Sequence, residues 1–189
     1  MAAGAAVAGY AATRVISGRS RQRPDPAAHD DFSPLPDSVH RTLALDDGGQ
    51  LHVVERGSGP PLVLLHGVTL SAVVWHYQMA DLADRFRVVA LDHRGHGLSL
   101  AGEGGYGAGR LAADLAQALD QLDLEGAVIV GHSMGGMVAQ RFLVDFPDVA
   151  RQRVAGVVLM STTAHTGSRV PGWERIVRST GPVLQGPMR

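Results

Sequence analysis

A serine between two glycines is the feature of this sequence that most directly predicts chemistry. Residues 128–137 read Val-Ile-Val-Gly-His-Ser-Met-Gly-Gly-Met, so Ser133 lies in a Gly-x-Ser-x-Gly pattern between an apolar run and a helix-like stretch. A sharp strand-to-helix turn exposes such a serine hydroxyl, and side chains at Gly131 and Gly135 would collide with the neighbouring strand and helix. The backbone N–H of Met134 would face an oxyanion formed on a carbonyl that the serine attacks. The strand-then-helix context disfavours a chance loop string, and the pattern predicts nucleophilic acyl transfer.

A second donor for the same oxyanion is expected from an earlier turn. His66, Gly67 and Val68 come directly after the apolar run Leu62–Leu65. A serine at a strand-to-helix turn is commonly served by a backbone N–H from the loop after an earlier strand of the same sheet. The N–H of Val68 is therefore the candidate donor, and His66 and Gly67 complete its motif.

A third polar motif follows the strand-like run Arg87–Leu91. It reads Asp92-His93-Arg94-Gly95-His96-Gly97-Leu98-Ser99. The glycines, Gly95 among them, indicate a tight loop, and Arg94 is placed to bind neighbouring carbonyls or carboxylates. The Asp and His residues could imitate a metal site, but their spacing lacks a helix or a further ligand, so a metal is disfavoured.

The elements that must position these motifs alternate along the chain from Val39 onward. Val39–Leu45 and Leu51–Arg56 flank an Asp-Asp-Gly-Gly turn and predict a hairpin. Four more short apolar runs follow the hairpin, and stretches with helical spacing of apolar residues separate them. The expected strands are Leu62–Leu65, Arg87–Leu91, Ala127–Val130 and Val154–Met160, and the expected helices are Trp75–Phe86, Leu111–Leu122 and Met134–Phe146. This order predicts an α/β fold in three layers, with a mostly parallel sheet led by an N-terminal antiparallel hairpin.

Taken together, the three motifs resemble the α/β-hydrolase fold, in the branch of esterases, lipases and haloperoxidase-like enzymes. The resemblance covers about Val39 to Met160 and is specific for the fold rather than for a substrate. It implies that Ser133 is the nucleophile and that Val68 and Met134 hold the oxyanion. Epoxide hydrolases and haloalkane dehalogenases of this fold use Asp at that position, so a serine implies a small apolar ester or related acyl substrate. It implies no metal or cofactor.

The pattern departs from the family after the sixth strand. The family order is Ser, then acid, then His, yet only 29 residues follow Met160. We therefore expect the catalytic acid and base beyond Arg189, an incomplete C-terminal part of the fold, and little activity from this stretch alone. An inert, truncated polypeptide or scaffold is the alternative. Of the histidines present, His165 is the first suspect for a base, whereas the other histidines near the motifs are expected to pack or to bind loops.

Composition excludes several other classes of function. The 189 residues are 45% apolar and 19% charged, with a formal net charge of −1, so neither disorder nor a nucleic-acid surface is indicated. All seventeen basic residues are Arg, which excludes lysine chemistry, and the absence of Cys excludes disulfides and thiolate sites. Residues 102–107 match Gly-x-Gly-x-x-Gly, but they lie too far from a strand end for a dinucleotide site, so a loop is expected.

The chain divides into three expected segments. Residues 1–36 are an Ala-rich stretch followed by a Pro- and Asp-rich linker, 37–160 form the hydrolase core, and 161–189 begin a cap. The apolar run before Arg14 is shorter than the roughly 20 residues that a membrane span needs. We therefore favour a tail over a membrane anchor, and a cytoplasmic protein.

Overall fold

The computed structural model describes residues 35–164. The predicted Ala-rich segment and most of its linker lie outside the described residues, as do His165 and nearly all of the predicted cap segment. Among residues 35–164, no helix is long and apolar enough to cross a membrane.

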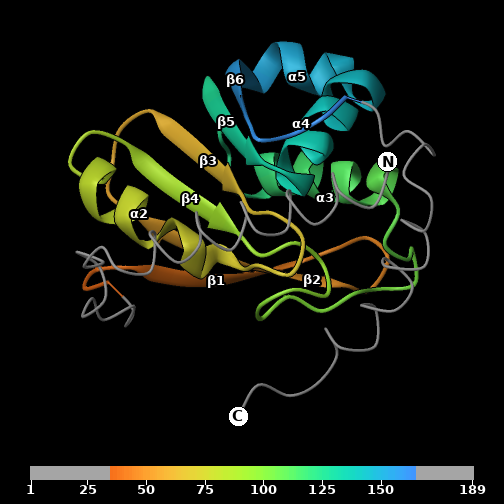
Figure 1. Cartoon of the computed structure of the whole chain (residues 1–189), viewed down its shortest axis with the longest axis horizontal. Coiled ribbons are helices and arrows are strands. Elements are labelled where there is room, and N and C mark those ends of the chain that lie inside the picture. The colour runs from red at the N-terminus through yellow and green to blue at the C-terminus, as the bar shows by residue number, and fades with distance from the viewer. Residues whose placement is uncertain (1–34, 165–189) are drawn as a thin grey trace, which may run out of the picture. The chain divides into compact units, whose positions relative to one another are not determined.

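Six strands form one sheet in the order β1-β2-β4-β3-β5-β6 (Figure 1). The strands are β1 (Val39–Ala44), β2 (Gln50–Arg56), β3 (Pro61–Leu65), β4 (Arg87–Leu91), β5 (Ala127–His132) and β6 (Val154–Met160). The first two pair antiparallel, β2 pairs antiparallel with β4, and the remaining pairs are parallel. The predicted α/β fold with an antiparallel hairpin leading a mostly parallel sheet is confirmed.

Helices cover both faces of this sheet. They are η1 (Ala72–Trp75), α2 (His76–Leu82), α3 (Ala108–Gln121), α4 (Met134–Asp145) and α5 (Pro147–Arg153). The predicted helix over 75–86 is instead a 3₁₀ turn followed by a helix that ends at Leu82. The helix α5 was not predicted, although Pro147 at its first position and Asp148 in its first turn are helix-start signals.

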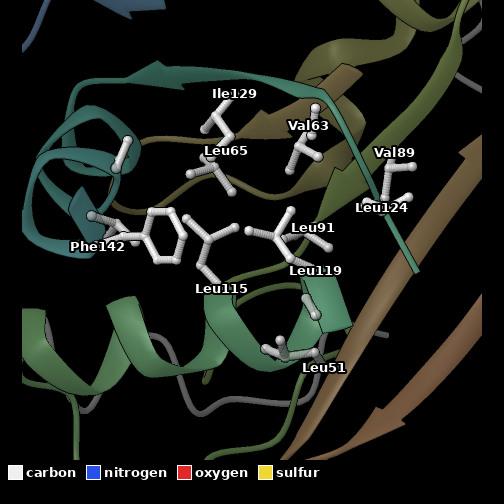
Figure 2. Packing of buried hydrophobic residues seen from close by; sticks show 14 of the residues in the cluster. Leu51, Val63, Leu65, Val89, Leu91, Leu115, Leu119, Leu124, Ile129 and Phe142 are labelled. Carbon is white, nitrogen blue, oxygen red and sulfur yellow. The ribbon is translucent and has the colours of Figure 1, made fainter. Parts of the chain in front are cut away.

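Strict alternation in the central strands produces two apolar cores. In β3, Val63 and Leu65 belong to the larger cluster, whereas Leu62 and Leu64 belong to the smaller one. Leucines of α3 and Phe142 of α4 fill the larger cluster (Figure 2), and η1 and α2 supply the smaller one. A parallel strand covered on both faces is apolar throughout, which explains why Leu62–Leu65 reads as an unbroken apolar run.

The outermost parallel strand is less covered than the central ones. Val158, Leu159 and Met160 at the end of β6 are 42–48% exposed, although all three side chains are large and apolar. Their backbone pairs with β5 on one side. Among the described residues, β6 is thus an edge strand with an apolar surface.

Candidate active site

The parallel register brings the three predicted motifs to one edge of the sheet. Leu65 of β3 is in register with Leu91 of β4 on one side and with Gly131 of β5 on the other. The carboxyl ends of the three strands therefore coincide, and the residues that follow them lie side by side. In open α/β sheets, ligands bind outside the carboxyl ends of the strands, where neighbouring connections diverge.

Ser133 occupies a strained turn between β5 and α4. Its φ of 51° and ψ of −113° lie in a region that L-residues rarely adopt. A Cβ at Gly131 would lie 2.6 Å from the Cα of Gly136, and a Cβ at Gly135 would lie 2.3 Å from the carbonyl oxygen of Leu65. The turn can therefore form only with glycine at both positions.

Backbone and side-chain hydrogen bonds fix this turn to the end of β6. The Ser133 N–H donates to the carbonyl oxygen of Met160 at 2.9 Å, and the Thr162 hydroxyl donates to the carbonyl oxygen of Ser133 at 2.7 Å. Met134 is the first residue of α4. The N–H groups of a first helical turn have no acceptor within the helix, so this end of α4 favours negative charge.

The loop after β3 lies directly against the serine. A Cβ at Gly67 would lie 3.3 Å from the Cβ of Ser133. The carbonyl oxygen of Gly67 accepts from His66 Nδ1 at 2.7 Å and from the Leu70 N–H at 3.3 Å. Because a trans peptide directs its C=O and N–H oppositely, these bonds turn the N–H of Val68 away from the His66 ring.

Two buried histidines join the loop after β3 to the loop after β4. The His93 N–H donates to His66 Nε2 at 3.0 Å, and His93 Nε2 lies 3.1 Å from the carbonyl oxygen of His66. Burial lowers the pKa of His66 to about 4 and the pKa of His93 well below its ordinary value. Both rings are therefore neutral near pH 7, and with both nitrogens of His66 engaged it is poorly placed to act as a base.

The Asp92 carboxylate accepts several hydrogen bonds. Its Oδ1 accepts from the Ala72 N–H at 2.6 Å, and its Oδ2 accepts from the Leu98 N–H at 2.9 Å and from His52 Nδ1 at 2.8 Å. Burial raises the pKa of Asp92, but the hydrogen bonds outweigh it and hold that pKa below the ordinary value. The loop after β4 is thus closed around a buried anion.

Arg94 is completely buried and binds two carboxylates. It donates to Asp114 of α3 at 2.6 and 2.7 Å and to Asp47 of the hairpin turn at 2.8 Å. It also donates to the carbonyl oxygen of Gly105, in the Gly-rich loop that precedes α3. Hydrogen bonds from Arg94 hold the pKa of Asp47 well below its ordinary value. Arg94 therefore joins the hairpin, the loop after β4 and α3.

The Gly-rich stretch 102–107 and Gly95 both lie in loops with close contacts to other segments. Residues 102–107 form a loop pinned to the hairpin, where the Gly104 N–H donates to Asp47 at 2.9 Å. A Cβ at Gly95, whose φ is 69°, would lie 2.6 Å from the Tyr106 ring. Within residues 35–164, no group of three His, Asp or Glu side chains is arranged to hold a metal.

Sequence reasoning missed the partners of the polar motifs. Asp114 lies on the apolar stripe of α3 next to Leu115, and a carboxylate there is a signal for a buried cation. His52 alternates with the core residues Leu51 and Val53 of β2, yet it too is buried, at 8% exposure. No signal in the sequence could have identified Ala72, because its contribution is a backbone N–H.

Comparisons with known proteins agree with the observed fold. A family model described as the alpha/beta hydrolase fold matches residues 60–187. A 2-(acetamidomethylene)succinate hydrolase of Mesorhizobium japonicum is 41% identical over 105 residues, 56% of this chain and 38% of that protein. An esterase from Exiguobacterium antarcticum is 30% identical with a TM-score of 0.63, over 67% of this chain and 46% of that one.

A third similar protein is an N-acyl homoserine lactone degrading enzyme. It is 35% identical to this chain with a TM-score of 0.58, and the match covers 66% of this chain and 45% of that one. In these three comparisons, the chain spans less than half the length of the proteins it matches.

Proposed function

The chain belongs to the α/β-hydrolase fold family, and on that premise we propose that it carries the nucleophile and the oxyanion site of a serine hydrolase. The observation that carries the proposal is the contact between two segments far apart in sequence. Ser133 stands at the N-terminus of α4, and Gly67 of the loop after β3 lies against it. Relatives whose names describe hydrolases and an esterase support hydrolysis of an ester or a related acyl compound.

In the proposed reaction, the Ser133 hydroxyl oxygen attacks the carbonyl carbon of the substrate. A bond forms between them, and the carbonyl oxygen becomes an oxyanion as a base takes the hydroxyl proton. The N–H groups of Val68 and Met134 donate to that oxyanion. Collapse of the intermediate breaks the bond to the leaving group and leaves an acyl-serine, which water then hydrolyses.

The proposed oxyanion site is rigid before the substrate arrives. His66 holds the Gly67 carbonyl oxygen at 2.7 Å, which sets the plane of the Gly67–Val68 peptide. A donor that is already oriented needs no reorganisation when charge develops, and one such donor typically contributes about 10²–10³ in rate. Since His66 is engaged in this role, we propose that the base and its acid come from outside residues 35–164.

The similar proteins and the surface around Ser133 bear on the substrate. One similar structure is named for degrading a lactone, which is a cyclic ester. We propose a small apolar ester or lactone, because exposed apolar side chains flank the loops around Ser133. These are Val68, Val73 and Leu98.

Covalent labelling tests the nucleophile. In a protein that carries the base and the acid as well, a fluorophosphonate probe should label Ser133, and Ser133→Ala should abolish labelling and lower p-nitrophenyl ester turnover by roughly three orders of magnitude or more. Ser58→Ala, at an exposed loop position, is the matched control and should label normally. Persistent labelling at Ser99 or Ser161 would contradict the assignment. An unlabelled wild-type protein would favour the inert scaffold.

A further inference from the structure

The Asp92 carboxylate, which is not one of the proposed catalytic groups, is a buried centre of polar contacts beside them. It accepts from Ala72, which ends the loop after β3, and from Leu98, which lies in the loop after β4. A single buried side chain therefore connects both loops. The next residue, His93, holds His66 at the other end of the first loop. Two consecutive residues thus fix both ends of the segment that carries the Val68 N–H.

His52 is the side chain that orients this carboxylate. Its Nδ1 lies 2.8 Å from Asp92 Oδ2, and its backbone N–H donates to the Ser99 hydroxyl at 2.8 Å. That hydroxyl in turn donates to the carbonyl oxygen of Asp92 at 2.7 Å. A carboxylate only accepts hydrogen bonds, so Nδ1 of His52 carries the proton in this contact. β2 thereby holds the loop after β4 by its backbone and its side chain together.

The outer nitrogen of the same ring faces the sheet edge. His52 Nε2 lies 2.9 Å from Nδ1 of His40 on β1, and the two rings stack with centroids 5.1 Å apart. His40 is exposed, whereas His52 and Asp92 are buried. Since His52 Nδ1–H is committed to Asp92, the outer contact involves only Nε2. Removing His40 should therefore leave the inner contact in place.

We propose that His52 is a positioning residue for the oxyanion loop and acts through the Asp92 carboxylate. The catalytic consequence rests on the proposed function, whereas the positioning itself does not. A donor at Nδ1 satisfies Asp92 Oδ2 and fixes the carboxylate plane. The plane then sets where Ala72 is held and, through the three residues between them, where the Val68 N–H points. Without this donor, a buried carboxylate loses one of three partners and its hold on both loops weakens.

Amide hydrogen exchange tests the positioning in the full chain. In His52→Leu, protection of the Ala72 and Leu98 amides should fall roughly tenfold to a hundredfold, as expected for losing a hydrogen bond to a buried charge. Protection at Ile129, in the central strand β5, should not change. His52→Asn should restore protection, because its amide nitrogen occupies the place of Nδ1. His40→Ala, which removes only the outer contact, should resemble wild type.

One further variant and one rate measurement complete the experiment. If the leucine variant does not fold, His52→Gln replaces it, because its donor lies one bond farther out and should fail to restore protection. In a protein that carries the base and the acid as well, the rate of fluorophosphonate labelling at Ser133 should fall about tenfold in the variants that lose protection and recover in His52→Asn.

The outcomes separate the two proposals. Unchanged protection at Ala72 and Leu98 in His52→Leu would overturn the positioning role. An equal loss at Ile129 would overturn it too, since His52 would then be an ordinary core residue. The positioning role would also be overturned if His52→Asn failed to restore protection of the Ala72 and Leu98 amides. If wild type is not labelled at Ser133 while the amide results hold, the proposed function fails and the positioning stands.

Discussion

The turn after β5 and the loop after β4 flank the end of β3, but different forces hold them in place. The turn is defined by steric exclusion, because only glycine fits at Gly131 and Gly135 and Ser133 accepts a positive φ. The loop is defined by buried ionisable groups, with Asp92 and Arg94 each bound to several partners. The residues that define the turn are adjacent in the chain, although Gly135 packs against Leu65 of β3. The charged side chains of the loop instead bind carboxylates from segments far away in the chain.

The sheet edge has to present the nucleophile and to hold the loops around it, and a different force serves each of these tasks. A sterically defined turn presents the serine in one geometry over a wide range of pH and salt, since no charge holds it. A loop held by buried charges can join several segments at once, but it depends on every partner being present and correctly ionised. The nucleophile is thus placed by shape, and its surroundings by electrostatics.

The largest effect is expected from removing the central cation of the charged loop. Arg94→Met would leave the buried Asp114 and the partly buried Asp47 without their main partner, which should lower the free energy of unfolding by about 3–5 kcal/mol. Urea unfolding measures this directly. Arg141→Met is the control, because its pair with Asp145 on α4 is exposed and should contribute less than about 1 kcal/mol. Equal losses in the two variants would contradict the buried role.

The turn should respond to volume instead of charge. Gly135→Ala places a methyl group 2.3 Å from the backbone oxygen of Leu65, so we expect a loss of about 2–3 kcal/mol in unfolding free energy. Gly156→Ala is the matched control, because a Cβ there meets nothing within 4 Å. A Gly135→Ala variant as stable as the Gly156→Ala variant would show that the turn accommodates a methyl group at position 135.

The pH dependence of stability should come from the loops. The folded-state pKa of His66 is about 4, below its unfolded value near 6.5, so the unfolded chain binds more protons between these values. Its contribution is fully present above pH 6.5 and is lost as pH falls through 4. When pH falls from 7.5 to 5, the loss of unfolding free energy from this group is about 2 kcal/mol.

Urea unfolding of wild type and His66→Asn at several pH values measures the slope. The variant should lose less stability on acidification than wild type, whereas Gly156→Ala should keep the wild-type slope. Identical slopes in wild type and His66→Asn would mean that another group carries the acid sensitivity.

The smallest effect concerns the strain stored at the nucleophile. Ser133→Gly and Ser133→Ala both remove the hydroxyl, but glycine accepts a φ of 51° without steric cost. We expect the glycine variant to be more stable by about 1 kcal/mol, measured by thermal unfolding. Ser99, whose φ is not positive, should show the reverse order of its Gly and Ala variants. An alanine variant at 133 equal to the glycine variant would argue against strain.

The same contrast explains what the sequence could predict. The turn around Ser133 was predictable, because its glycines, its serine and the flanking elements are adjacent in the chain. The sheet was predictable for a related reason, since apolar runs such as Leu62–Leu65 and the hairpin turn are local signals. Both depend on short-range sterics and on burial patterns that a single segment displays by itself.

The partners in the charged loop could not be predicted in the same way. Arg94 was expected to bind carboxylates, but which ones depends on how α3 and the hairpin pack. Asp114 is 20 residues and Asp47 is 47 residues away from Arg94. The role of His52 depends on the pairing of β2 with β4, which places its ring near Asp92. Such contacts follow from the topology and are visible only when the strands have been placed.

The strand order also determines when β3 can pair with each of its neighbours during synthesis. β3 pairs with β4, which follows after about 20 residues, but also with β5, which begins about 60 residues later. At about 5–20 residues per second, a ribosome takes roughly 3–12 s to deliver that second partner. During that interval one edge of β3 has no neighbour, and its leucines and valine are open to any other nascent chain. The strand that ends beside the nucleophile therefore needs shielding from other chains while the protein is made.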